Sequence, residues 1–421
     1  MHFVHVVQLY HPVTSGSVKF FVELAAQLVR RGHRVTILTT TAGELEAFWL
    51  PNKREFPAAT EVLAGTTIHR FPIQRFSPHP LIYPIIRRLL VELGRIHVPV
   101  PFLRALSAFT PRTPLLNAWI IANAADIDVL HVTNVTLDGL IQPVLDIAER
   151  HAIPIVSTPF IHLGVATDDS LVRYYQMPQQ LDILHRSRVV FTMTERERRF
   201  VIECGVHTSL VHTVGAGVTP TEVIGGDGAA FRAEHTISGP IVLQIGAMAR
   251  DKGTLTSIAA LEKLWQSGLD ATLVLIGAPL EHFVSAYEAL PLATQARIVL
   301  LAHATDSQKR DALAASQLLL LPSRTDSFGI VFLEAWCNRI PVIGADAGGI
   351  PDVITDGVDG FLVPFDDAHT LADRIRRILE DNSLADRFAA AGFAKVVERF
   401  TWDAIGEVIV PWCLQAHSRQ P

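Results

Sequence analysis

Short apolar runs alternate with helical patterns along most of the chain, and this alternation restricts the fold more than any other feature. The first run is residues 4–7, and a loop that contains Gly16 follows it. Residues 20–29 then place apolar side chains at helical spacing up to Gly32, and residues 35–38 form the next run. Strand, loop, helix and strand in succession predict a βαβ unit, in which the two strands are parallel.

A second series of the same kind begins after a glycine-rich break at residues 225–228 and 238–240. A chain of 421 residues also suits two hydrophobic cores better than one. We therefore expect an α/β protein with two Rossmann-like domains, residues 1–224 and 225–401. The last helix, at about residues 402–421, is expected to pack back on the first domain.

The remaining apolar runs predict the other strands of the two sheets. They are residues 129–132, 153–157 and 189–193 in the first domain, and 241–245, 272–276, 298–301, 318–321 and 342–343 in the second. Helical patterns fall between them, for example at Leu371, Ile375 and Ile378. Each domain is therefore expected to contain a doubly wound, mostly parallel sheet.

Composition and motifs exclude several classes of protein. The formal net charge of −6 argues against a general nucleic-acid binder, which needs excess lysine and arginine. The three cysteines are widely spaced, so neither a disulfide framework nor a zinc site is expected. No G-x-G-x-x-G follows residues 4–7, which argues against a Rossmann oxidoreductase.

Location follows from the same kind of evidence. The amino-terminal residues lack the pattern of a signal peptide, and no apolar run is long enough to cross a membrane. We expect a cytoplasmic protein, with any membrane contact peripheral and at the inner membrane face. Residues 81–121, which mix aliphatic side chains, prolines and arginines, allow two interpretations. They form irregular helices that cover the first sheet, or a basic, apolar surface that touches anionic lipid or guides an acceptor.

Residues 321–335 carry the strongest candidates for a functional site. A strand is expected to end at the start of this segment, and a helix to begin near Phe328. Asp326 lies just before that helix and Glu334 about two turns along it, where carboxylates can accept from sugar hydroxyls and a ribose diol. The N–H groups of Phe328 and Gly329 can donate. The alternative is that Asp326 is only a helix N-cap and Glu334 a solvated helix residue.

Basic residues follow the first strand of the second domain, in the loop of residues 246–253. Arg250 and Lys252 lie near a helix start, where positive charge and free N–H groups favour a pyrophosphate. The alternative is two surface charges in a turn. His162 follows a strand of the first domain and is a candidate for positioning and hydrogen bonding, although a lone histidine is more often structural.

A metal site has one superficial candidate, the Asp-x-Asp pattern at Asp126 and Asp128. This pattern precedes a strand instead of ending one, so capping or flanking that strand explains it better. We therefore infer no metal and no other cofactor.

The segment from Asp326 to Glu334 resembles the E-x7-E region of the family 4 glycosyltransferases, with Asp326 at the first Glu position. Ordered blocks along nearly the whole chain share this resemblance. Ser15-Gly16 is similar to the first-loop Gly-Gly of the family, and Lys252 matches its basic loop. Ala247 stands where the family usually has arginine, and Arg250 is taken as its substitute. Further matching blocks are residues 31–35, 215–218, 348–352 and 357–363.

This resemblance implies the GT-B fold, with two Rossmann-like domains that face each other across a cleft, and transfer of a sugar with retention of configuration. It assigns the acceptor to the first domain and a UDP-, GDP- or ADP-sugar donor to the second. The acceptor is a sugar, a lipid-linked glycan or a small molecule. The implied catalytic residues are His162, Asp326 and Lys252.

The resemblance also implies the donor contacts. Gly16, Arg250 and Lys252 face the phosphates, Glu334 the ribose, and Asp326 with the two amides the donor sugar, while His162 supports that sugar. The amides belong to Phe328 and Gly329. The alternatives are an inverting GT-B transferase, a nucleotide-sugar epimerase and a non-catalytic nucleotide-sugar-binding protein.

Overall fold

The computed structural model describes residues 1–76, 79 and 81–418, and these form two compact units. The first unit comprises Met1–Ile161, Ser170–Gly215 and the chain from Ile405 onward. The second comprises His162–Asp169 and Ala216–Ala404. The eight-residue segment His162–Asp169 thus belongs to the second unit although it is flanked in sequence by the first.

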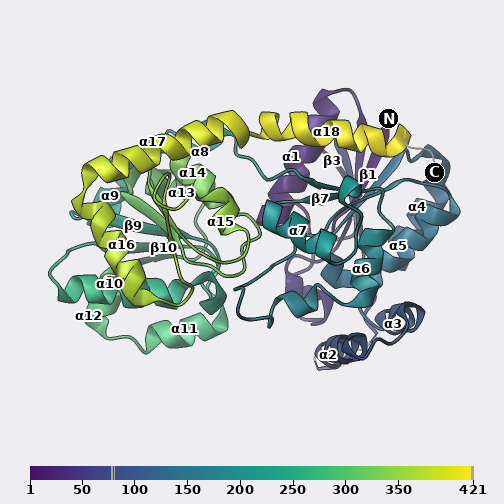
Figure 1. Cartoon of the computed structure of the whole chain (residues 1–421), viewed down its shortest axis with the longest axis horizontal. Helices are drawn as coiled ribbons and strands as arrows, with labels where there is room; N and C mark the ends of the chain where they lie inside the picture. The colour runs from purple at the N-terminus through teal and green to yellow at the C-terminus, as the bar shows by residue number, and fades with distance from the viewer. Residues whose placement is uncertain (77–78, 80, 419–421) are drawn as a thin grey trace. The chain divides into compact units, whose positions relative to one another are not determined.

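The first unit is built on an eight-stranded sheet with the order β3-β4-β2-β1-β5-β6-β7-β8. Figure 1 labels β1, β3 and β7 of this sheet. All neighbouring strands are parallel except the edge pair β3 and β4. The strands are β1 (His2–Val6), β2 (Arg34–Thr40), β3 (Thr60–Leu63), β4 (Thr66–Phe71), β5 (Val129–Thr133), β6 (Ile155–Thr158), β7 (Val189–Thr192) and β8 (Val211–Thr213).

Helices connect these strands. They are α1 (Gly16–Arg30), α2 (Ile82–Arg95), α3 (Val100–Ser107), α4 (Pro114–Asn123), α5 (Asp138–Arg150), α6 (Pro178–His185) and α7 (Glu195–Glu203). The terminal helix α18 (Trp402–Ser418) packs on this unit from Ile405 onward. Its Glu407 pairs with Arg31, and its Trp412 stacks on His212 with ring centroids 3.5 Å apart.

The second unit repeats the architecture with a six-stranded, fully parallel sheet of order β11-β10-β9-β12-β13-β14. Its strands are β9 (Ile241–Ile245), β10 (Thr272–Ile276), β11 (Ile298–Leu301), β12 (Leu318–Leu321), β13 (Val342–Ala345) and β14 (Phe361–Val363). Its helices are α8 (Pro220–Val223), α9 (Gly228–Glu234), α10 (Thr254–Gln266), α11 (Glu281–Glu288), α12 (Leu292–Gln295), α13 (Asp306–Ala315), α14 (Ile330–Cys337), α15 (Ile350–Val353), α16 (Ala368–Glu380) and α17 (Asn382–Arg399). The prediction of an α/β protein with two parallel sheets is therefore confirmed.

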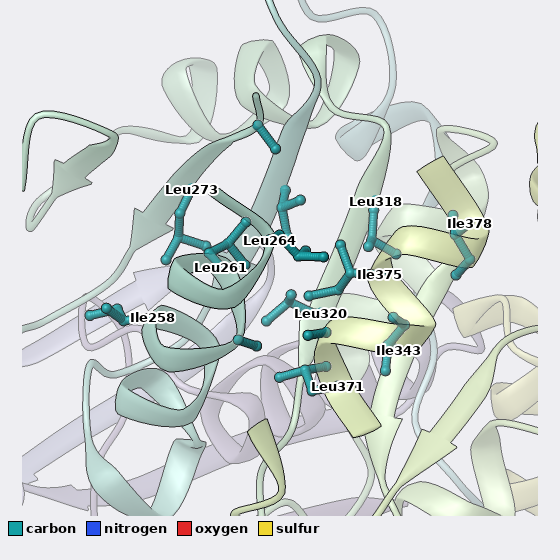
Figure 2. Close-up of a cluster of buried hydrophobic side chains, with 14 of the residues drawn as sticks. Ile258, Leu261, Leu264, Leu273, Leu318, Leu320, Ile343, Leu371, Ile375 and Ile378 are labelled. Atoms are coloured by element: carbon teal, nitrogen blue, oxygen red, sulfur yellow. The ribbon is translucent and has the colours of Figure 1, made fainter. Parts of the chain in front are cut away.

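The core of the second unit lies between its sheet and the helices α10 and α16 (Figure 2). Aliphatic side chains from both helices point toward those of the strands. They are Ile258, Leu261 and Leu264 of α10, Leu371, Ile375 and Ile378 of α16, and Leu273, Leu318, Leu320 and Ile343 of the strands. Strands covered in this way read as continuous apolar runs, which is why the sequence shows them clearly.

Residues 81–121 fold into three regular helices, α2, α3 and α4, and one of their arginines is not on the surface. Arg87 is buried, with Nη1 3.1 Å from Oδ1 of Asp138 on α5, and Asp138 is fully buried. The amide of Gln179 donates to the other oxygen of Asp138 at 2.8 Å. Arg87 is therefore not part of the basic surface that was one of the two interpretations of residues 81–121, because its charge neutralises a buried carboxylate.

The Asp-x-Asp pattern has structural partners. Asp126 pairs with Arg34, and Asp128 accepts the backbone N–H of His2 at 2.7 Å. In the described part of the chain, no three His, Cys, Asp or Glu side chains gather in a way that could hold a metal ion. Among the same residues, no helix has the length and apolar character that crossing a bilayer requires.

Replacing Arg87 by alanine should lower the free energy of unfolding by about 3–5 kcal/mol, because Asp138 loses its counter-charge while remaining buried. Burial raises the pKa of Asp138, so the carboxyl group of Asp138 binds a proton more tightly in the folded protein than in the unfolded chain. The destabilisation should therefore be larger at pH 8 than at pH 5. Urea unfolding at the two pH values measures this difference in stability.

The control is Arg88→Ala, at an exposed neighbouring position, which should change stability by less than about 0.5 kcal/mol. Equal losses of stability in both variants would contradict the role of Arg87 as the partner of Asp138.

Candidate active site

A partly buried ion pair lies between the loops that follow β9 and β12. Lys252 ends the 3₁₀ turn η6 (Arg250–Lys252), and its Nζ is 2.8 Å from Oδ2 of Asp326. The side chain of Asp326 is only 19% exposed and that of Lys252 23%. His162 is the third member of this group, because the charges of Lys252 and Asp326 both affect the pKa of its imidazole ring. The structure thus brings together the three residues that the sequence suggested for catalysis.

Asp326 is not the N-cap of the following helix. Helix α14 begins at Ile330, and its N-cap is Gly329, whose φ of 93° lies in the left-handed region that favours glycine. The backbone N–H groups of Phe328 and Gly329 donate to no protein acceptor within the described residues. A helix start of this kind can donate hydrogen bonds to a ligand.

Glu334 is not a solvated helix residue. It lies on α14 with an 11% exposed side chain, and Nζ of Lys309 on α13 is 2.7 Å from Oε1 and 2.6 Å from Oε2. Lys309 therefore neutralises this carboxylate and fixes its orientation. The sequence analysis did not identify Lys309, because no local pattern connects it with Glu334.

Arg250 is the most exposed of the candidates, at 71% of its side chain. Its Nη2 lies 3.6 Å from Oδ2 of Asp366. A surface pair of this kind contributes little and leaves the side chain free to turn toward a ligand. The next glycine, Gly253, has a φ of 69° and starts α10, and a Cβ there would lie 2.3 Å from the carbonyl oxygen of Pro322. Only glycine therefore permits this close approach of the two loops.

Arg324 joins the loops of the site, and the sequence analysis gave it no role. Its backbone N–H donates to the carbonyl of Asp251 at 3.0 Å, and its Nε donates to Oδ1 of the same residue at 2.9 Å. Its Nη1 also donates to Oδ2 of Asp168, at 2.9 Å. Arg324 thus connects the β9 loop, the β12 loop and the segment His162–Asp169.

Two glycines after β13 hold the same loops through the backbone. The N–H of Gly348 donates to the carbonyl of Gly164 at 2.8 Å, and the N–H of Gly349 donates to the carbonyl of Asp326 at 2.9 Å. Gly348 has a φ of 56°, and a Cβ on it would lie 2.4 Å from that carbonyl oxygen. These contacts fasten both His162–Asp169 and the backbone of Asp326 to one loop.

The chain enters this segment from Ile161, whose N–H donates to the carboxylate of Glu197 at 2.8 Å. The other oxygen of Glu197 accepts from the N–H of Met193 at 2.6 Å. Burial raises the pKa of Glu197 to about 7, although the two N–H groups favour its charged form. Glu197 therefore anchors the residue directly before His162.

The charges of the site set its protonation. Burial would raise the pKa of Asp326, but the Lys252 ammonium and its hydrogen bond outweigh burial and hold this pKa below its usual value. Burial and the nearby Lys252 lower the pKa of His162 to about 4, against a smaller opposite effect of Asp326. At neutral pH the site therefore presents a carboxylate, an ammonium and a neutral imidazole, which has one donor and one acceptor nitrogen.

Gly16 is the first residue of α1 in the first unit, after the N-cap Ser15, whose Oγ accepts from the N–H of Val18. The other candidate residues all lie in the second unit. The phosphate role expected for Gly16 stays a prediction, and the structure places this residue in the first turn of a helix.

Replacing Lys252 by methionine should raise the pKa of His162 toward 6.5, because a nearby positive charge is removed while the ring remains buried. An NMR titration of labelled histidine, with the resonance assigned through His162→Gln, measures this pKa. The matched control is Lys309→Met, which removes an ammonium that faces Glu334 and should leave the pKa of His162 unchanged. An unchanged His162 pKa in Lys252→Met would show that the two side chains are not neighbours.

Two family models match successive parts of the chain. The model described as "Glycosyl transferase 4-like domain" matches residues 15–217, and the one described as "Glycosyl transferases group 1" matches residues 229–395. Two full-length relatives are enzymes of sugar transfer. The D-inositol 3-phosphate glycosyltransferase of Xylanimonas cellulosilytica is 26% identical over 99% of this chain and 96% of its own. The N-acetyl-alpha-D-glucosaminyl L-malate synthase of Bacillus anthracis is 24% identical over 94% and 92%.

Solved structures show the same fold. HepE of Anabaena, in complex with UDP and glucose, matches with a TM-score of 0.72 and 18% identity over 99% of this chain and 100% of its own. Sucrose-phosphate synthase of Thermosynechococcus elongatus matches with a TM-score of 0.74 and 19% identity over 99% of both chains. The chain therefore belongs to the family 4 glycosyltransferases, a family of enzymes, and has their GT-B fold.

Proposed function

We propose that this enzyme transfers a sugar from a nucleoside-diphosphate sugar to an acceptor hydroxyl, with retention of configuration and without a metal ion. The observation that carries the proposal is the partly buried Lys252–Asp326 pair beside a neutral His162. Such a group offers a cation to a leaving diphosphate and polar groups to a sugar. The solved structure of HepE, which has the same fold and holds UDP and glucose, supports this choice of donor.

The positive charge for the diphosphate comes from the chain itself. Lys252 supplies a compact ammonium, and Arg250 supplies a guanidinium on an exposed side chain that can turn toward the ligand. The start of α1 at Gly16 adds backbone N–H groups. Preorganised charge of this kind stabilises a leaving phosphate in the transition state, so the mechanism needs no metal for that purpose.

Retention follows from attack on the face that the leaving group departs from. The bond between the anomeric carbon and the phosphate oxygen breaks, and a bond to the acceptor oxygen forms. The acceptor proton passes to the departing phosphate oxygen. Asp326 and the amides of Phe328 and Gly329 orient the sugar hydroxyls, while the neutral His162 donates one hydrogen bond to the same sugar.

Glu334 is assigned to the ribose of the donor. Lys309 contacts both of its oxygens, which orients the carboxylate. Two hydroxyls on neighbouring carbons can donate to such a carboxylate. The binding site of the acceptor, which is a sugar, a lipid-linked glycan or a small molecule, is assigned to the first unit.

Donor turnover tests the reaction. Hydrolysis and binding measured across UDP-, GDP- and ADP-sugars should identify one donor that is turned over in the presence of excess EDTA. NMR of the first-formed product should show the anomeric configuration of the donor. Inversion would favour the inverting transferase, and binding without turnover the non-catalytic protein. Loss of activity in EDTA with recovery in manganese would contradict the phosphate site.

Substitutions separate the two carboxylates. Glu334→Gln should raise the donor KM and weaken nucleotide binding by about 1–3 kcal/mol, because the ribose contact is equally strong in the ground and transition states. Asp326→Asn should mainly lower kcat, on the order of tenfold or more, and leave nucleotide affinity nearly intact, because the sugar ring changes shape during reaction. Calorimetry with the free nucleotide and steady-state kinetics measure the two effects.

The control for Asp326→Asn is Asp367→Asn. Asp367 is a true N-cap, whose carboxylate accepts the N–H groups of His369 and Thr370 at the start of α16. Asparagine caps a helix about as well as aspartate, so this variant should keep its activity and stability. Full turnover in Asp326→Asn would remove Asp326 from the catalytic group.

A further inference from the structure

Helix α2 has apolar side chains on two faces, and only one of them is buried. Ile86, Leu90 and Val91 belong to a core cluster with Leu103 of α3 and Met177. In Figure 1 α2 and α3 lie next to each other at the edge of the first unit, and the two helices pack together. This inner face explains how α2 is held.

The other face, here called the outer face of α2, consists of Leu81, Ile85, Arg88, Leu89, Glu92 and Ile96. These residues follow one another at spacings of about three to four residues, and all are exposed, Ile96 to 70%. A row of large apolar side chains on a solvent-facing helix is unusual in a monomeric protein and marks a surface that binds something.

The adjoining helix adds aromatic residues. Phe102 on α3 is 58% exposed. Phe109, just after α3, and Phe76 are also exposed and contact each other edge to face, with ring centroids 4.8 Å apart. Exposed apolar and aromatic residues therefore extend beyond α2 within the same part of the sequence.

Charge indicates the kind of partner. Residues 81–121 contain five arginines, one glutamate and no lysine or aspartate, although the whole chain carries a net charge of −6. Arg87 and Arg104 are used in ion pairs with Asp138 and Asp146. Arg88 lies within the outer face and has no ion-pair partner in the described part of the chain. Glu92 on the same face is paired with Arg95 at 3.8 Å, so the charge that the outer face leaves unpaired is the positive charge of Arg88.

We propose that the outer face of α2 binds the surface of an anionic lipid bilayer. An amphipathic helix lies in the interfacial plane when apolar side chains enter the acyl boundary and arginines meet anionic headgroups, and stable attachment needs both contributions. None of these residues belongs to the donor site, so the proposal is independent of the donor and acceptor.

Vesicle co-sedimentation of the full chain tests this inference. The protein should bind vesicles of phosphatidylcholine with phosphatidylglycerol, bind those of phosphatidylcholine alone at least several-fold more weakly, and dissociate as salt is raised. Ile85→Ser with Leu89→Ser should weaken binding at least tenfold through the lost apolar contact. Arg88→Glu should weaken it on the order of tenfold through reversed charge, because each basic residue near an anionic surface contributes appreciably.

Two matched controls come from other surfaces of the chain. Leu292 on α12 is 82% exposed and Arg199 on α7 is exposed, so Leu292→Ser and Arg199→Glu should bind vesicles as the wild type does. Circular dichroism verifies that each variant is folded, and Arg88→Glu provides an independent test if the double variant is not. Absence of binding to anionic vesicles, or equal losses in the controls, would overturn the proposal. So would a dimer in light scattering that the double variant dissociates, since the outer face would then join two copies.

Discussion

The ion pair between Lys252 and Asp326 is the interaction on which the candidate site depends. Two largely buried charges are stable only when each is the partner of the other, so the loops after β9 and β12 must stay together. The same pair determines the chemistry of its surroundings. It lowers the pKa of Asp326, and its ammonium adds to the effect of burial in lowering the pKa of His162.

Much of the fold and the main site residues could be predicted from the sequence, because the signals are local. Buried parallel strands appear as apolar runs, and residues after a strand or before a helix lie at the sheet edge where ligands bind. Asp326, Lys252 and His162 are candidates because of these positions, and the resemblance to the family selects them as the predicted catalytic residues. The sequence did not predict β3, β4 and β8. β3 is an exposed edge strand, two of the three buried positions of β4 are polar, and β8 has only three residues.

Interactions between distant positions could not be predicted. Nothing near Arg87 indicates Asp138, nothing near Glu334 indicates Lys309, and nothing near Arg324 indicates Asp168. In each case the charged residue is of a type that is usually found on the surface. Only its partner, which is distant in sequence, explains why the residue is buried or held in one orientation. The roles of such residues therefore become visible only when the fold brings the two segments together.

The short segment His162–Asp169 has a consequence for engineering. The chain leaves the first unit at Ile161, returns at Ser170, leaves again after Gly215 and returns at Ile405. A gene cut between the two units would leave this segment on the wrong fragment, without its partners Gly348 and Arg324. Chimeras that exchange one unit for that of a relative should therefore carry the segment with the second unit, although in sequence it lies inside the first.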